Sequence, residues 1–382
     1  MFLGVFLNTM PMFRVPKLGD ISLILTTLFS LSTAIPALPR QTQDDNKSCK
    51  NIFFGPLVER FPDPSLIYTD KVWYSFATGT NGKQGTWIEG AYSKDFETWT
   101  SLDGERIPDL PKANWTKQEG TNSVWAPDVM QRTDGEFLMY FAALDGSASG
   151  GRHCVGIARS DDISKTFSAE GLDAFVCNAT HGGTIDPAFF RDHDEKDDNI
   201  AAYVVYKADG GRVGIPTELL IQQVDKDGKF EGIRKAKNSD GSTKDPVLLL
   251  RAESKDHNVE APYIIRRGKT YFLFFSTHLY NEAAYDIQYA TSDNVLGPYK
   301  RKSVALLTSD TAPYKEDCKL DGEKTYFFGP GGPSFQSIGD NKVVFHNYHS
   351  PANATGKRGL WTGTFEIKQD SEDGPTVVWT SS

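Results

Sequence analysis

The stretch VEAPYIIRRGKTYFLFFSTH, residues 259–278, contains the pattern that organises this chain. An acid stands beside a proline, an apolar run follows, and a Gly-Lys turn leads into a second, aromatic run. Polar and apolar residues alternate within each run, so the stretch predicts two antiparallel strands joined by a short turn.

The same arrangement recurs four more times along the chain. The other copies are FPDPSLIYTDKVWYSFATG from Phe61, VWAPDVMQRTDGEFLMYFAAL from Val124, TIDPAFFRDHDEKDDNIAAYVVYKA from Thr184 and GGPSFQSIGDNKVVFHNYHS from Gly331. Several short strands per unit, repeated at this period, predict an all-β protein with the architecture of a five-bladed β-propeller. Two stacked β-sandwiches are the alternative, but they would not explain why an acid recurs near the start of successive units.

The N-terminus predicts a secretory leader. The apolar run 21–31 is too short to span a bilayer, basic residues precede it, and small residues precede a cleavage point after Ala34. The expected organisation is a signal peptide over 1–34, a short N-terminal segment over 35–50 and one catalytic propeller domain over 51–382.

Sequons and cysteines agree with an extracellular, secreted protein. Four N-x-[ST] sequons predict glycosylation, at Asn46, Asn114, Asn178 and Asn353. The four cysteines, Cys49, Cys154, Cys177 and Cys318, lack metal-ligand spacing. They allow three disulfide connectivities. We favour Cys154–Cys177, which closes a loop of moderate length, and hence Cys49–Cys318.

Charge and hydropathy exclude several kinds of partner. The net charge is −9 and no basic run of any length is present, which argues against a nucleic-acid partner. Beyond the leader, no segment approaches the roughly 18 apolar residues that a membrane span needs. We expect a monomer that acts on a neutral oligo- or polysaccharide.

Four acids hold corresponding places near the starts of the first four units, namely Asp63, Asp128, Asp186 and Glu260. In a propeller the first strand of every blade lines the central channel, so these acids should meet in one axial pocket. Gathered carboxylates are costly unless they bind a cation or perform acid/base chemistry. Aromatic residues near the acids favour a sugar as the substrate, and the candidates are Phe61, Trp87, Trp125, Phe189 and Tyr263.

These blocks also resemble a known family. FPDPSLI, TIDPAFFRD and VEAPYIIRRGKTYFLFFS, supported by WAPDV and SDNVLGPY, are similar to the signature blocks of glycoside hydrolase family 43. The resemblance implies a five-bladed propeller that hydrolyses arabinofuranosides, arabinans, xylosides or galactans with inversion. It implies that Asp63 is the general base, that Glu260 is the general acid, and that Asp186 orients the acid and tunes its proton affinity.

The fifth unit departs from the family pattern. Many members carry a GPGH-type segment whose histidine helps to hold an axial metal ion, whereas Gly332 stands at that position here. This argues against an axial calcium ion, with His346 and His349 as candidate substitutes, and we expect no required cofactor. Arg358, in GKRGLW, resembles a fifth-blade arginine that contacts sugar in some relatives.

The sequence therefore predicts a secreted glycoside hydrolase that acts on plant cell-wall pentose glycans. The GPGG and RGLW segments favour an α-L-arabinofuranosidase or arabinanase over a β-xylosidase or galactanase of the same family. A retaining enzyme of the invertase type is one rival, but its Asn-Asp-Pro-Asn-Gly block is absent. A non-catalytic, lectin-like propeller is the other rival, and it would not need acids in successive units.

Overall fold

The computed structural model describes most of the chain beyond its N-terminal segment. The described residues are 52–79, 86–110, 113, 115–116, 124–146, 151–171, 173–194, 197–229, 246–311, 327–336, 341–348, 357–369 and 374–380. The chain divides into two compact units, 1–47 and 48–382, and the second contains every described residue. The predicted signal peptide, Cys49, Cys318, His349 and the sequons at Asn46, Asn114 and Asn353 lie outside the described residues. No described helix has the length and hydropathy needed to cross a bilayer.

Four of the blades are meanders of four consecutive antiparallel strands. Blade 1 comprises β2 (Ile67–Thr69), β3 (Val72–Thr78), β4 (Ile88–Ser93) and β5 (Thr100–Leu102). Blade 2 comprises β6 (Val124–Gln131), β7 (Phe137–Leu144), β8 (His153–Ser160) and β9 (Ser168–Glu170). Blade 3 comprises β10 (Thr184–Asp194), β11 (Asp197–Ala208), β12 (Glu218–Val224) and β13 (Val247–Arg251). Blade 4 comprises β14 (Val259–Arg267), β15 (Thr270–Thr277), β16 (Gln288–Ser292) and β17 (Lys300–Arg301). Two 3₁₀ turns, η2 (Ala179–His181) and η3 (Gly210–Val213), lie beside blade 3.

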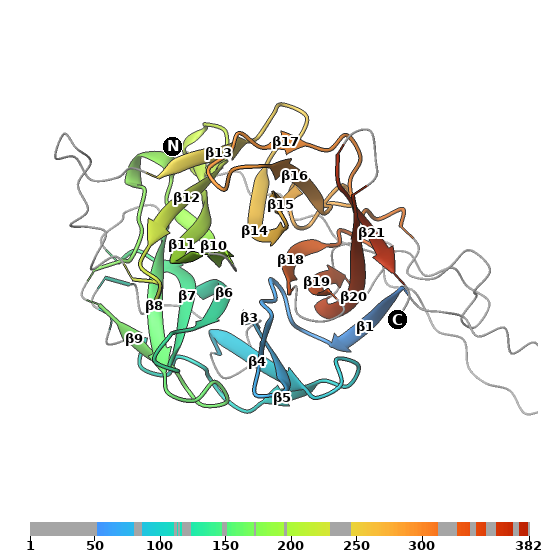
Figure 1. Ribbon diagram of the computed structural model, residues 1–382. Helices are drawn as coiled ribbons and strands as arrows, with labels where there is room; N and C mark the ends of the chain where they lie inside the picture. Colours follow the sequence, from blue (N-terminus) through green and yellow to red (C-terminus); the bar gives the residue numbers. More distant parts are fainter. Residues whose placement is uncertain are drawn as a thin grey trace, which may run out of the picture. The chain divides into compact units, whose positions relative to one another are not determined.

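Blade 5 contains strands from both ends of the chain. Its own strands are β18 (Gly331–Phe335), β19 (Lys342–Tyr348) and β20 (Arg358–Lys368). The early strand β1 (Phe53–Val58) pairs with the first half of β20, and β21 (Thr376–Thr380) pairs with the second half. The sheet therefore closes the ring, which confirms the five-bladed propeller (Figure 1). The repeat predicted the five units but not the contribution of β1.

Apolar clusters fill the space between neighbouring blades. One joins blades 1 and 2 around Phe76 and Phe141, and another joins blades 3 and 4 around Val205 and Phe275. Similar clusters join blades 2 and 3, blades 4 and 5, and blades 5 and 1. The second strands of blades 2, 4 and 5 are buried on both faces over nearly their whole length, which agrees with their mostly apolar sequences.

One backbone feature recurs at the start of all five blades. In each blade the residue before a proline has a positive φ: Asp63 (54°), Ala126 (44°), Asp186 (53°), Ala261 (51°) and Gly332 (60°). In blades 2 to 5 the pairing register between the first two strands shifts across this dipeptide, as in a β-bulge. Left-handed conformations are costly for residues with a Cβ atom, and such strain often accumulates at functional sites.

The feature that recurs at the same position in every blade is therefore the positive-φ residue before proline, and not the acid. Asp63 and Asp186 precede their prolines directly, whereas Asp128 follows Pro127 and Glu260 lies two residues before Pro262. The expectation that the acid occupies the same phase in every unit is correct only for Asp63 and Asp186. The other two carboxylates reach the axis from different positions of the bulge.

Candidate active site

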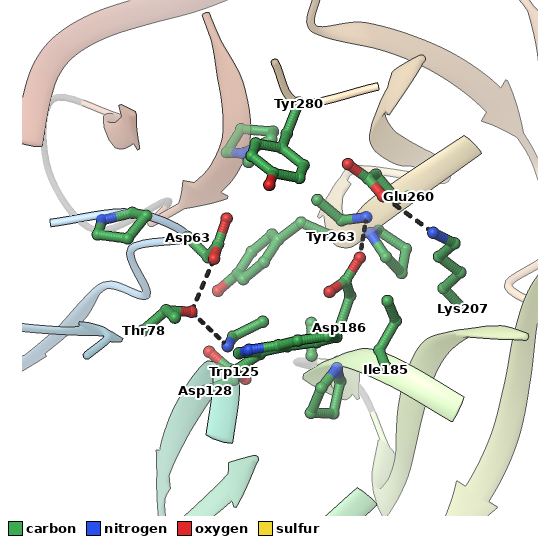
Figure 2. A pocket seen from close by; sticks show the side chains of 18 of the residues that line it. Asp63, Thr78, Trp125, Asp128, Ile185, Asp186, Lys207, Glu260, Tyr263 and Tyr280 are labelled. Atoms are coloured by element: carbon green, nitrogen blue, oxygen red, sulfur yellow. Dashed lines mark hydrogen bonds and ion pairs between the residues drawn. The ribbon is translucent and has the colours of Figure 1, made fainter. Parts of the chain in front are cut away.

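A cavity of about 810 Å³ opens where the first strands of the five blades meet. Its volume is within the range typical of small-molecule sites. Most of the residues predicted for the site line this cavity, namely Asp63, Trp125, Asp128, Asp186, Glu260, Tyr263 and Arg358. Figure 2 shows Asp63 on one side and Asp186, Glu260 and Lys207 together on the other.

Three predicted aromatic contacts lie elsewhere. Phe61 is only 1% exposed and packs in the core cluster between blades 5 and 1. Trp87 packs against the cluster between blades 1 and 2, and Phe189 stacks on Tyr140 with ring centroids 6.3 Å apart. None of these three residues lines the cavity, so we correct their assignment from sugar contact to blade packing. Nearness in sequence to the site does not decide which way a ring points, and all three rings pack between blades.

Asp63 lies between two donors. Thr78 donates from Oγ1 to Oδ2 of Asp63 over 2.7 Å, and Arg358 donates from Nη1 to Oδ1 over 2.8 Å. Burial alone would lower the pKa of Arg358, but the charge of Asp63, together with the neighbouring tyrosines, outweighs burial and raises it. Hydrogen bonds and a nearby cation both stabilise a carboxylate, so this environment suits a group that acts as a base.

Asp186 and Glu260 form a coupled acidic pair on the opposite wall. Burial, followed by the charge of Glu260, raises the pKa of Asp186 to about 7. Oδ2 of Asp186 accepts a hydrogen bond of 2.9 Å from the backbone N–H of Ala261, directly after Glu260. Oε2 of Glu260 accepts from Nζ of Lys207 at 2.9 Å and from Nδ2 of Asn258 at 2.8 Å. Such a pair can retain one proton close to neutral pH.

Asp128 has a different environment from the other acids. It is 6% exposed, and burial raises its pKa to about 7 although the backbone N–H of Phe189 donates to its Oδ2 at 2.8 Å. A carboxyl group in this setting is neutral through most of the acidic range and can then donate a hydrogen bond as well as accept one. It lines the cavity, and contact of Asp128 with the substrate stays a prediction from the sequence.

Comparison with known proteins agrees with this geometry. Residues 55–370 match the model of Glycosyl hydrolases family 43. The chain belongs to that family. The family assignment makes the protein a glycosidase, and it makes the cavity the candidate catalytic centre of a family 43 enzyme.

Individual relatives show how far the likeness extends. The chain is 25% identical over 316 residues to the extracellular endo-α-(1→5)-L-arabinanase 1 of Bacillus subtilis, which covers 80% of this chain and 85% of the relative. Among solved structures, a thermostable family-43 glycoside hydrolase superposes with a TM-score of 0.65 at 20% identity, over 85% of this chain and 94% of its own. An endo-1,4-β-xylanase from Bacteroides thetaiotaomicron superposes with a TM-score of 0.62 at 21% identity, over 85% of this chain and 96% of its own.

His346, a candidate metal ligand in this family 43 chain, is buried beside Asp63. Nδ1 of the buried His346 accepts a hydrogen bond of 3.1 Å from the backbone N–H of Asp63, so the ring proton lies on Nε2. Burial keeps the pKa of His346 well below its usual value. A Cβ atom at Gly332 would lie 2.8 Å from Nδ1 of His346, so a histidine at 332 would collide with this ring. His346 thus fixes the backbone of Asp63, and a metal-holding role for it stays a prediction.

The sequence prediction missed several residues of the site. Thr78 and Lys207 end their strands at the axis, and the signal for Lys207 was a single cation at the end of the apolar run AAYVVYK. Tyr280, 48% exposed, lines the cavity beside Arg358, whose guanidinium lies 4.6 Å from its ring centroid. Tyr280 is in a loop without strand periodicity, so no pattern in the sequence could have located it.

Proposed function

We propose that the protein is a secreted, monomeric, inverting glycosidase of plant pentose glycans, with α-L-arabinofuranosidase or arabinanase activity. The observation that carries the proposal is the placement of Asp63 and Glu260, which reach one cavity from blades 1 and 4. An inverting reaction needs a base and an acid on opposite faces of one sugar ring.

The proposed reaction balances with these groups alone. Asp63 takes a proton from water while the water oxygen forms the new bond to the anomeric carbon. The bond from that carbon to the glycosidic oxygen breaks, its electron pair moves to the oxygen, and this oxygen takes the proton of Glu260. The coupling to Asp186, whose pKa is about 7, keeps a proton available to the pair in mildly acidic solution. No step is routed through a metal ion.

The charges of the cavity suit a neutral substrate. Three cationic residues line it, Lys207, Arg212 and Arg358, and each is paired with a carboxylate. With one proton on the Asp186–Glu260 pair and one on Asp128, the carboxylates leave little net charge to attract an anionic sugar. The preference for arabinose rests on the name of the Bacillus relative and on the GPGG and RGLW segments.

One hydrolysis panel tests the proposal. It contains aryl α-L-arabinofuranoside, aryl β-D-xyloside, linear arabinan, arabinoxylan and galactan, and proton NMR follows the anomer that forms first. We expect the arabinose-containing substrates to react fastest and the product to be inverted. If xylosides are hydrolysed tenfold faster than arabinosides, xylose replaces arabinose as the proposed substrate sugar. A retained anomer would favour the invertase-type mechanism. Binding without hydrolysis of any of them would favour the lectin-like alternative.

A further inference from the structure

Lys207 departs from a pattern that three of the other four blades share. Each blade has one second-strand residue that pairs with the residue two positions before the recurring proline. These residues are Thr78, Ala142, Lys207, Ser276 and His346. Thr78, Ser276 and His346 each accept a hydrogen bond from the pre-proline N–H of the next blade, at 2.8, 3.1 and 3.1 Å. These contacts link neighbouring blades around the axis.

A lysine cannot make this link, because its ammonium group only donates. At the corresponding junction between blades 3 and 4, the N–H of Ala261 donates to Asp186 instead. Lys207 therefore does not serve blade closure in the way that its counterparts do, although its side chain is only 5% exposed. A buried cation is costly unless it is paired, so its partners indicate its role.

The partners of Lys207 are two acids of the site. Its Nζ lies 2.9 Å from Oε2 of Glu260 and 3.2 Å from Oδ1 of Asp209, which Arg212 holds through a 2.7 Å contact. Burial alone would lower the pKa of Lys207, but the charges of Glu260, Asp209 and Asp186 outweigh burial and raise it. The ammonium group is therefore charged throughout the working pH range.

The contacts of Lys207 and Asn258 distinguish the two oxygens of Glu260. Both donors bind Oε2, and Asn258, 4% exposed, is itself held by donating to the carbonyl of His278 at 3.1 Å. A carboxyl group whose one oxygen accepts two hydrogen bonds cannot easily carry its proton there. The proton that Glu260 donates therefore lies on Oε1.

The charged and titratable groups around Glu260 come from four segments. They are Asp186 on β10, Lys207 and Asp209 at the end of β11, Tyr285 in the loop before β16 and His257 in the loop before β14. Tyr285 is a neutral phenol whose pKa is raised by burial and by the charge of Glu260. Asp186 and Asp209 are acids like Glu260, whereas Lys207 is the cation that contacts it.

We propose that Lys207 and Asn258 are positioning residues for the general acid: together they hold Oε2 of Glu260 so that Oε1 delivers the proton, and the charge of Lys207 sets the upper pH limit of activity. The pH limit arises because an adjacent cation makes the Asp186–Glu260 pair release its proton at lower pH. The inference rests on the proposed function only in treating Glu260 as the acid.

The first test is a pH profile of Lys207→Met, which removes the charge and nearly keeps the volume. We expect the alkaline limb of kcat/KM to move up by about one pH unit or more. On glycosides with poor leaving groups kcat should fall at least about tenfold, whereas aryl glycosides with good leaving groups, which need little protonation, should change less than about threefold. Lys207→Arg keeps the positive charge, so the alkaline limb of its pH profile should match that of wild type. Equal losses on both substrate classes with an unmoved limb would overturn the proposal.

Control variants separate this role from general stability. Lys229→Met removes another partly buried lysine of blade 3, one that pairs with Glu170 at 3.0 Å and does not line the cavity, and it should leave the limb and both rates unchanged. Asn258→Leu removes the second donor without changing charge, so it should lower kcat on poor leaving groups and move the limb clearly less than Lys207→Met does. If Lys207→Met does not fold, Asn258→Leu and Lys207→Arg still decide between the outcomes.

A measurement without substrate distinguishes failure of this inference from failure of the proposed function. The protein is labelled with ¹³C at glutamate carboxyl groups, and Glu260→Gln assigns the signal of Glu260. We expect this signal to titrate at higher pH in Lys207→Met than in wild type. An unchanged titration overturns the inference even if the enzyme is active. A shifted titration in a protein that hydrolyses none of the panel supports the contact and rejects only the proposed reaction.

Discussion

At the scale of single residues, the two walls of the cavity give Asp63 and Glu260 different properties. Asp63 accepts hydrogen bonds from Arg358 and Thr78, whereas Glu260 lies beside Asp186, whose pKa burial raises to about 7. Replacing Asp63 with Asn should lower kcat by about two to four orders of magnitude on every substrate, because the base is lost.

Replacing Glu260 with Gln should reduce the rate strongly only for substrates with poor leaving groups, because good leaving groups need little protonation. Steady-state kinetics on an aryl glycoside and on a glycan measure both, and an Asp63→Asn variant with near wild-type rates would reject the base assignment.

Asp128 predicts a pH dependence of stability. Its pKa is about 7 in the folded protein and about 3.8 when unfolded, so between these pH values the folded state binds more protons than the unfolded state. Stability contributed by this group is therefore present below about pH 4 and is lost as pH rises to 7. Asp128→Asn, which mimics the neutral acid, should lose less stability between pH 5 and 7 than wild type does. The free energy of unfolding in urea at the two pH values checks this, and identical slopes would contradict it.

For single residues, the sequence predicted the carboxylates of the cavity more accurately than the orientation of aromatic side chains. Asp63, Asp186 and Glu260 could be predicted because a proline marks each bulge, and their side chains do line one cavity. Phe61 could not be placed correctly, because it lies outside the strands, where no periodicity shows which way a ring points. Lys207 escaped notice because its partner Glu260 is 53 residues away in sequence, and only the fold brings them together.

At the scale of elements, the disulfide Cys154–Cys177 is confirmed. It joins β8 to the segment before η2, and its Cα atoms are 4.7 Å apart, within the usual range for a disulfide. Replacing both cysteines with Ser should lower the free energy of unfolding by about 2–5 kcal/mol, as in smaller secreted domains. Thermal melts of the double variant against wild type, each under non-reducing conditions, provide the measurement. An unchanged melting temperature would assign the bridge no stabilising role. The pairing of Cys49 with Cys318 stays a prediction.

Strand order could be predicted at this scale, whereas irregularities could not. The repeated segments contain the first two strands of blades 2 to 4, in the predicted order. The bulges, however, move Asp128 and Glu260 off the phase of Asp63 and Asp186, and a repeat read by residue type alone cannot detect such a shift. Asn178 gives a second example: it caps η2 by accepting from the N–H of His181, and its predicted glycan remains untested.

At the scale of the whole molecule, β1 completes the last blade. Phe53 is 1% exposed and meets Phe327, Phe345 and Trp379 edge to face. Phe53→Ala should cost about 3–5 kcal/mol, because it leaves a cavity in the core of the closing sheet. Phe54 points to the other face of the same strand and is less buried, so Phe54→Ala is the matched control and should cost clearly less. Urea unfolding of both variants compares the two, and equal losses would contradict the role of Phe53 in closure.

The order in which the ribosome releases the strands gives β1 a further consequence. The strands of the first four blades pair with neighbours in sequence, whereas Val58 pairs with Leu360, about 300 residues later. At typical elongation rates of about 5–20 residues per second, β1 waits roughly 15–60 seconds for its partner. During that time an unpaired edge strand carrying Phe53 is exposed, and exposed strand edges invite association with other chains. Ring closure is therefore the last event of folding, and the yield of active protein should depend on how well the cell shields this short segment until β20 is made.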